Sequence, residues 1–141
     1  MSTDQSIDSS RTVTAALRIS APVTKAQEIA ERLAVKPTRL VEKGKSPARE
    51  SRWIYESSST SEDIEAHIDE LIALMERNGS GFSSLPPDCQ IDIWCTINME
   101  KEFLGFSLPS NLMQRAVALT VDIVFSVYGN SARLTGSSSG V

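Results

Sequence analysis

The residues with the clearest chemical potential are cations gathered in one short segment. Residues 36–52 carry six basic and two acidic side chains, a local net charge of +4. Clustered arginine and lysine side chains can bind carboxylates, phosphates or RNA. The alternative is a solvated loop held to acidic neighbours by surface ion pairs worth less than about 1 kcal/mol each. The candidate binding residues are Arg39, Lys43, Lys45, Arg49 and Arg52, with Trp53 in the strand that follows.

The charge of the rest of the chain indicates which class of partner residues 36–52 could bind. Residues 53–76 carry seven acidic side chains and no lysine or arginine, and the whole chain has a net charge of -4. An acidic chain argues against nucleic acid as the partner. Trp53 and Tyr55 lie at strand spacing, which indicates packing rather than base stacking. We therefore expect a non-enzymatic module that binds an acidic protein; the alternative is a domain that binds a small ligand or anion through residues 36–52.

Two sequence patterns suggest catalysis, but each lacks further residues that the chemistry would need. The segment 44–46 has the Gly-Lys-Ser of a P-loop, but position 39 is arginine where that motif needs glycine, and Pro47 follows directly. His67, the only histidine, is expected on the flank of a helix with Asp63 and Glu70 as neighbours. Acid–base catalysis or metal binding there would need further groups that the sequence does not nominate. We predict no catalytic residue, no metal site and no cofactor, and an enzyme is the hypothesis with the least support.

The cysteines and the second tryptophan bear on compartment and contacts. Cys89 and Cys95 are six residues apart on one predicted strand, about 20 Å, which excludes a disulfide between them. Two free thiols fit a reducing compartment. The sequence has no signal peptide and no apolar run of membrane-spanning length, so we expect a cytoplasmic protein without a membrane contact. Trp94 faces away from Ile93, either beneath a second layer or exposed as a contact residue.

Hydrophobic periodicity predicts the elements that must position these residues. Their order is strand, helix, strand, helix, strand, strand, helix, strand. Strands are expected at 12–20, 52–56, 89–99, 103–108 and 121–128, and helices at 25–34, at 62–77 and from Pro109 onwards. Thr24 and Gln27 form a capping-box pattern before the first helix. Residues 80–88 are expected to form a loop.

The same periodicity predicts which side chains face the core. The helix at 62–77 has an apolar stripe of Ile64, Ile68, Leu71, Ile72 and Met75. The last helix is expected to turn Leu112, Met113, Ala116 and Val117 inward, and the last strand Val121, Ile123, Phe125 and Val127. Residues 11–128 would form a single domain between a disordered lead (1–10) and a flexible tail (129–141). This pattern fits an α+β two-layer sandwich: a mixed, mostly antiparallel sheet with helices on one face, like a ferredoxin-like plait with an extra helix.

Several short motifs carry a family resemblance. They are the turn Leu33-Ala-Val-Lys-Pro-Thr38, the segment Glu42-Lys-Gly44, Trp53 at the start of a strand, the helix with Ile64, His67, Ile68 and Leu71, and the closing Asp122-Ile-Val-Phe125. Over about residues 11–128 the chain resembles a bacterial family catalogued as a domain of unknown function, DUF4279. The resemblance implies a small, single-domain, cytoplasmic bacterial protein and transfers no catalytic residue. Some relatives look like immunity proteins of toxin systems, which points to a toxin domain as an acidic partner. The oligomeric state stays open.

Overall fold

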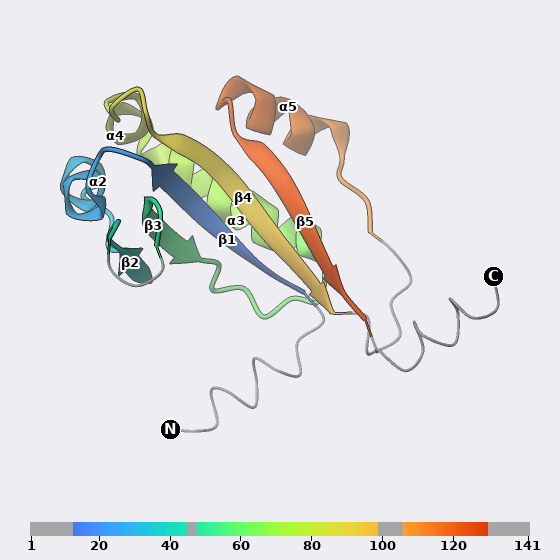
Figure 1. Cartoon of the computed structure of the whole chain (residues 1–141). Helices are drawn as coiled ribbons and strands as arrows, with labels where there is room; N and C mark the ends of the chain where they lie inside the picture. The colour runs from blue at the N-terminus through green and yellow to red at the C-terminus, as the bar shows by residue number, and fades with distance from the viewer. Residues whose placement is uncertain (1–12, 45–47, 99–105, 130–141) are drawn as a thin grey trace.

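A computed structural model describes residues 13–44, 48–98 and 106–129 (Figure 1). Within these residues the chain forms an α+β fold with a five-stranded mixed sheet and four helices. The strands are β1 (Val13–Ala21), β2 (Arg39–Val41), β3 (Ser51–Glu56), β4 (Gln90–Asn98) and β5 (Asp122–Tyr128). The helices are α2 (Ala26–Leu33), α3 (Ile64–Arg77), α4 (Gly79–Ser83) and α5 (Ser110–Ala118).

The sheet has the strand order β2-β3-β1-β4-β5. The first three neighbouring pairs are antiparallel, and β4 and β5 are parallel. Parallel neighbours need a crossover connection, and the chain between β4 and β5 contains α5. The predicted α+β class and the mixed, mostly antiparallel sheet are thus confirmed.

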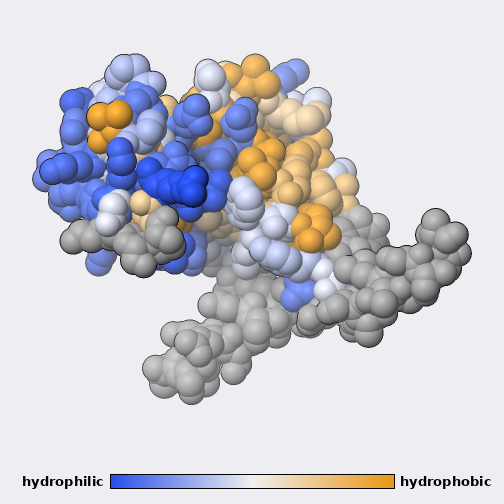
Figure 2. Space-filling model, in the orientation of Figure 1, coloured by the Kyte–Doolittle hydropathy of each residue, from blue (hydrophilic) through white to orange (hydrophobic). Residues whose placement is uncertain are grey.

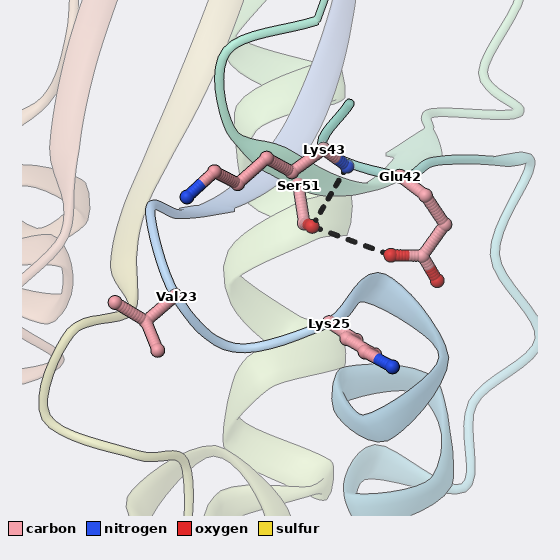
Figure 3. Close-up of a pocket in the computed structure, with 5 residues that line it drawn as sticks. All are labelled: Val23, Lys25, Glu42, Lys43 and Ser51. Carbon is pink, nitrogen blue, oxygen red and sulfur yellow. Dashed lines mark hydrogen bonds between the residues drawn. The ribbon is translucent and has the colours of Figure 1, made fainter. Parts of the chain in front are cut away.

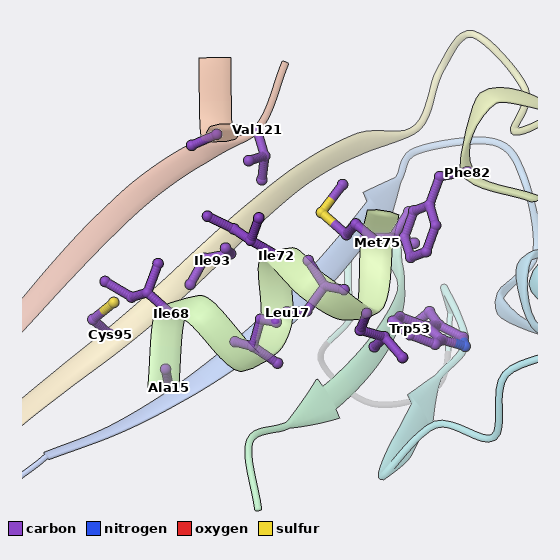
Figure 4. Close-up of a cluster of buried hydrophobic side chains, with 14 of the residues drawn as sticks. Ala15, Leu17, Trp53, Ile68, Ile72, Met75, Phe82, Ile93, Cys95 and Val121 are labelled. Carbon is purple, nitrogen blue, oxygen red and sulfur yellow. The ribbon is translucent and has the colours of Figure 1, made fainter. Parts of the chain in front are cut away.

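The core lies between one face of this sheet and the helices. Every second residue of β1 is buried, and α3 packs across β1 and β4 with the whole apolar stripe predicted from the sequence (Figure 4). Leu17, Ile93 and Trp53 extend this layer from three strands. Fully burying each large apolar side chain contributes about 1.5–3 kcal/mol, so this layer is the main source of stability. The opposite face of the sheet has no helix packed on it within the described residues.

Two short elements went unpredicted. β2 lies inside the segment expected to be a basic loop, where Arg39 and Leu40 pair with β3. α4 lies inside the expected loop 80–88, and the Phe82 ring meets Trp53 edge-on at 6.4 Å. Of the strand predicted at 103–108, residues 103–105 lie outside the described residues and 106–108 are not in a strand. The predicted lead (1–10) and most of the predicted tail also lie outside the described residues.

The last helix buries less than expected. Leu112 and Ala116 are buried as predicted, but Met113 and Val117 are 45% and 76% exposed, so their inward assignment was wrong. The reason is the roll of α5 against α3. Arg115 donates to the Asp69 carboxylate at 2.6 Å and to both Glu76 carboxylate oxygens at 2.9 Å, which holds that side of α5 toward α3.

The N-terminus of α2 is capped from a distant part of the chain. The Glu42 carboxylate accepts the backbone N–H groups of Ala26 at 2.9 Å and Gln27 at 3.0 Å. The capping box predicted from Thr24 is wrong, because the Thr24 hydroxyl instead donates to Asp88 at 2.6 Å. The strand pairing that places β2 beside β3 therefore also brings the carboxylate that stabilises α2.

Removing this carboxylate should destabilise the domain in a pH-dependent way. The hydrogen bond from Ala26, followed by those from Gln27 and Ser51, lowers the pKa of Glu42. A lowered folded-state pKa adds stability above the unfolded value of about 4.3, and this stability is lost as the pH falls through the folded-state pKa. Glu42→Gln should cost about 1 kcal/mol of unfolding free energy at neutral pH and progressively less in acid.

Urea denaturation at neutral and acidic pH measures this difference. Glu62→Gln is the matched control, because Glu62 is exposed and lies outside the helix-capping contact. A cost for Glu42→Gln that stays constant down to the acid limit of folding would contradict the capping role.

Candidate functional site

The structure divides the predicted binding residues between the two sides of the sheet. Trp53 lies on the helix side and is 0% exposed, so its assignment as a partner contact is wrong. Alternate residues of a strand point to opposite faces, so Arg52 points to the uncovered side. Arg39 pairs with Ile54, which shares a face with Arg52, so Arg39 lies on the same side. Arg49 is exposed in the β2–β3 connection, and Lys45 lies outside the described residues.

Lys43 takes part in a structural contact at the base of that connection. Its ammonium donates to the Pro22 carbonyl at 2.9 Å, and its backbone N–H donates to the Ser51 hydroxyl at 3.1 Å. The surrounding hollow, of about 400 Å³, is lined by Val23, Lys25, Glu42, Lys43 and Ser51 (Figure 3). The carboxylate in this hollow already binds the α2 N-terminus. The hollow contains charges of both signs, and Glu42 and Lys43 are already bound to backbone groups. These contacts do not favour the binding of an anion here.

The strand register gathers three arginines on the uncovered side. Ile54 of β3 pairs with Arg18 of β1 on one side and with Arg39 of β2 on the other. Arg52 lies two residues before Ile54 and shares its face. Because neighbouring strands lie about 4.8 Å apart, the three arginines start within roughly 10 Å of one another. With Trp94 they line a hollow of about 250 Å³. We name Arg18, Arg39, Arg52, Ile54 and Trp94 the arginine face.

Arg18 is held in place on this face. Its Nε and Nη2 donate to the two oxygens of Asp92 at 3.0 and 3.1 Å. Its guanidinium also lies over the Trp94 ring, 4.1 Å from the centroid. This bidentate ion pair and the cation–π contact together fix the plane of the Arg18 guanidinium. Arg18 is therefore a preorganised part of the surface, with its charge partly balanced by Asp92.

Arg39 and Arg52 keep donors available. The Arg52 side chain is 43% exposed and its ion pair with Glu50 is long, at 3.7 Å. Its Nε is buried without a hydrogen-bond partner in the described structure, so a ligand would meet the terminal Nη groups. The Arg39 side chain makes no hydrogen bond or ion pair with any residue that the structure describes. A guanidinium presents a planar fork of donors that matches a carboxylate or phosphate. Together with the half-buried Trp94 ring, two such groups can bind an acidic ligand that also has apolar surface.

Charge changes sign across this side of the sheet. One row of paired positions runs Arg39, Ile54, Arg18, Asp92 and Asp122, from β2 to β5. The three arginines lie on β2, β3 and β1, where Glu56 of β3 lines the same hollow, and Asp92 and Asp122 lie on β4 and β5. A ligand with negative charge is therefore directed to the β2 side.

Sequence reasoning missed Arg18 and Asp92, although a weak signal exists for both. Each is a charged residue at the polar position of an alternating strand. Their proximity depends on the pairing of β1 with β4, 74 residues away, which alternation alone does not give. The open assignment of Trp94 is resolved: it is half-buried on the uncovered side, with Arg18 over its ring.

His67 lies in the core rather than on a helix flank as predicted, and is 0% exposed. Its Nε2 donates to the Ser61 carbonyl at 2.8 Å, so its Nδ1 accepts from the Ser57 hydroxyl at 2.6 Å. A serine beside a histidine resembles a nucleophile and its base, but Ser57 is only 9% exposed. The pair fixes residues 57–61 to α3. Glu70 supports the same loop, since it accepts the N–H groups of Ser58 and Ser59.

The cysteines are free, as predicted. Cys95 is buried, which raises the pKa of its thiol to about 12. Cys89 is half-buried, and burial followed by the neighbouring Asp88 raises its pKa. Low-pKa thiolates are the reactive form, so neither thiol is activated.

Within the described residues no group of three or more histidine, cysteine, aspartate and glutamate side chains is placed to hold a metal. None of the described helices has the length and apolar composition needed to span a bilayer.

Comparison with protein families gives one clear result. A family described as "Domain of unknown function (DUF4279)" matches residues 11–130. The chain belongs to the DUF4279 family. The matched range includes every strand and helix described above, and therefore the whole arginine face. Comparisons with curated proteins and with solved structures find no match to this DUF4279 protein.

Proposed function

We propose that this DUF4279 protein is a non-enzymatic binding module that takes up an acidic segment of a partner protein on its arginine face. The observation that carries this proposal is a pair of exposed guanidinium groups, with Arg39 opposite Ile54 and Arg52 two residues before Ile54 on the same face. Arg18, fixed by Asp92, supplies a third cation and lies over the half-buried Trp94 ring. Tryptophan and arginine are the residues that most often dominate binding energy at protein interfaces.

The shape of the face favours a protein segment over a buried small molecule. Small-ligand pockets usually enclose about 300–1,000 Å³ and bury most of the ligand. The hollow on the arginine face has about 250 Å³ and lies on an open sheet surface. The half-buried Trp94 ring adds apolar contact beside the cations, whereas Ile54 is buried. An acidic protein segment can use both features, whereas a lone anion uses only the charge.

The alternative is a site for a small anion, favoured by the convergence of three arginines on one hollow. Inorganic phosphate distinguishes the two. Under the alternative, phosphate at a hundred times its dissociation constant should stabilise the protein by about 2.7 kcal/mol. Under the main proposal, phosphate has little effect on the melting temperature.

A matched set of charge reversals tests the proposal. The test variant is Arg39→Glu/Arg52→Glu. The control is Lys36→Glu/Arg49→Glu, which makes the same change in net charge at two exposed positions off the arginine face. Tagged baits of both variants and of the unaltered protein are used to capture partners from bacterial lysate, with quantitative mass spectrometry.

The protein captured by the unaltered bait should fall about tenfold or more with Arg39→Glu/Arg52→Glu, since two charged contacts are lost. Capture by the control should stay within a few-fold. Equal loss with both variants would show only a net-charge effect, and loss with neither would remove the arginine face as the site.

We also propose a fold assignment and a setting. The chain order β1, α2, β2, β3, α3, β4 and the strand order β2-β3-β1-β4 support a ferredoxin-like plait, with α5 and β5 as an added unit. The free Cys89 and Cys95 support a cytoplasmic location. The acidic partner proposed is a toxin domain, which would make the protein immunity-like.

A further inference from the structure

The exposed apolar side chains gather at one end of the sheet. Of the seven large hydrophobic side chains that are exposed in the described structure, six lie on α5, on β5 or just before α5. They are Phe106, Met113, Val117, Phe125, Val127 and Tyr128. Figure 2 shows the hydrophobic surface on the side where Figure 1 places α5 and β5. Contiguous apolar surface on a globular domain usually marks an interaction site.

This surface follows from the position of β5 at the end of the sheet. In the described part of the chain, no strand pairs with the edge of β5 that faces away from β4. Phe125 and Val127 lie on the helix side, as predicted, but are 37% and 59% exposed rather than buried. The Phe106 ring covers Phe125 only in part, with the ring centroids 5.1 Å apart.

β5 also lacks the features that keep an edge strand single. Proteins usually protect such edges with lysine, proline, a bulge or an inward-facing charge. β5 has the sequence Asp-Ile-Val-Phe-Ser-Val-Tyr, whose only charge is Asp122 at its first position. Its backbone edge is therefore suited to pair with another strand.

We propose that β5 pairs antiparallel with β5 of a second copy of this chain, with the two-fold axis at Phe125. Phe125 is the central residue of the seven-residue strand, so this register uses the full length of the strand. It places Phe125 opposite Phe125 of the second copy and Ile123 opposite Val127. Opposed residues of an antiparallel pair share a face, so these side chains form one apolar layer on the helix side.

The charge pattern of the strand favours a second copy as the occupant. Around the axis at Phe125, Asp122 falls opposite Tyr128, whose hydroxyl can donate to a carboxylate. No like charges oppose each other within the paired strands, so the strand is complementary to itself, as a two-fold interface requires. The arginines of the arginine face lie on β1, β2 and β3, none of which pairs with β5, so this inference does not depend on the proposed function.

Sedimentation velocity across micromolar concentrations tests the dimer. The unaltered chain should sediment as a species of about twice the 15.4 kDa mass of one chain. Phe125→Lys, which opposes two like charges at the axis, should be monomeric at the same concentrations. Val23→Lys is the control, because Val23 is 77% exposed and lies away from β5, and it should remain dimeric. Circular dichroism confirms that each variant is folded. A monomeric unaltered chain, or a Phe125→Lys chain that still dimerises, would overturn the proposal.

A cysteine cross-link tests the register separately. Opposed side chains in an antiparallel pair have Cβ atoms about 4.5–5.5 Å apart, close enough for a disulfide after a small adjustment. In a Cys89→Ser background, Phe125→Cys should give a covalent dimer on mild oxidation, and Val23→Cys should not. A dimer in sedimentation that cross-links equally through both positions, or through neither, would rule out the axis at Phe125.

Discussion

Trp53→Ala is expected to lower the free energy of unfolding by about 3–5 kcal/mol, the largest effect of any single change proposed for this protein. The Trp53 side chain is 0% exposed and contacts two other rings, stacked on Tyr55 at 6.3 Å and edge-on to Phe82 at 6.4 Å. Removing it leaves a large cavity between β3 and α4. Because a small domain has only about 5–15 kcal/mol of stability, much of the chain should unfold at moderate temperature.

The matched comparison is Trp94→Ala, which removes the same side chain from the uncovered side of the sheet. It should cost about 1 kcal/mol, chiefly from the lost contact with Arg18. Urea denaturation followed by circular dichroism measures both variants without relying on tryptophan fluorescence. Similar costs for the two variants would contradict the assignment of Trp53 to the core and Trp94 to the surface.

His67→Leu is expected to cost about 2–4 kcal/mol even though it introduces an apolar side chain into an apolar core. The change leaves the Ser57 hydroxyl and the Ser61 carbonyl without the partners they have at 2.6 and 2.8 Å. Each buried polar group left unpaired costs about 1–3 kcal/mol. The loop that joins β3 to α3 should loosen as a result.

Ser57→Ala in the same assay separates the two bonds of His67. It removes the hydroxyl but keeps the Nε2 donation to Ser61, so it should cost roughly half as much as His67→Leu. Hydrogen exchange of the Ser58 and Ser59 amides reports directly on the loop. If His67→Leu is neutral in denaturation and leaves this exchange unchanged, the histidine does not hold the loop.

The sequence predicted the parts of the fold that depend on local periodicity. Alternation identified β1 and β4, and the apolar stripe identified α3, because burial of one face imposes a period of two or 3.6 residues. β2 and α4 were missed because they are only three and five residues long. Elements that short are defined by their tertiary partners, such as β3 for Arg39–Val41 and Trp53 for Phe82.

The candidate site was predicted from the local excess of basic residues, and the register of the paired strands changed which residues belong to it. The local excess of bases drew attention to Arg39 and Arg52, which the structure places on the arginine face. Sequence proximity then added Trp53, although adjacent strand residues point to opposite faces. Arg18 could not be included, because it reaches this face only through the pairing of β1 with β3 and β4. Likewise, Phe125 follows the core pattern, but alternation cannot show that β5 ends the sheet.

We propose that acidic ligands bind the arginine face, and the indole N–H signals of a ¹⁵N-labelled sample test this binding most directly. The chain has two tryptophans, and only Trp94 lies on this face. A short oligoglutamate peptide serves as the acidic ligand and oligolysine as its control.

Oligoglutamate should shift the Trp94 signal and leave the Trp53 signal in place. Oligolysine should not reproduce the shift, and Arg39→Glu/Arg52→Glu should abolish it. A Trp94 signal that stays fixed while the backbone amide signals of Lys43 and Arg49 move would contradict binding at the arginine face. It would place acidic ligands on the β2–β3 connection instead.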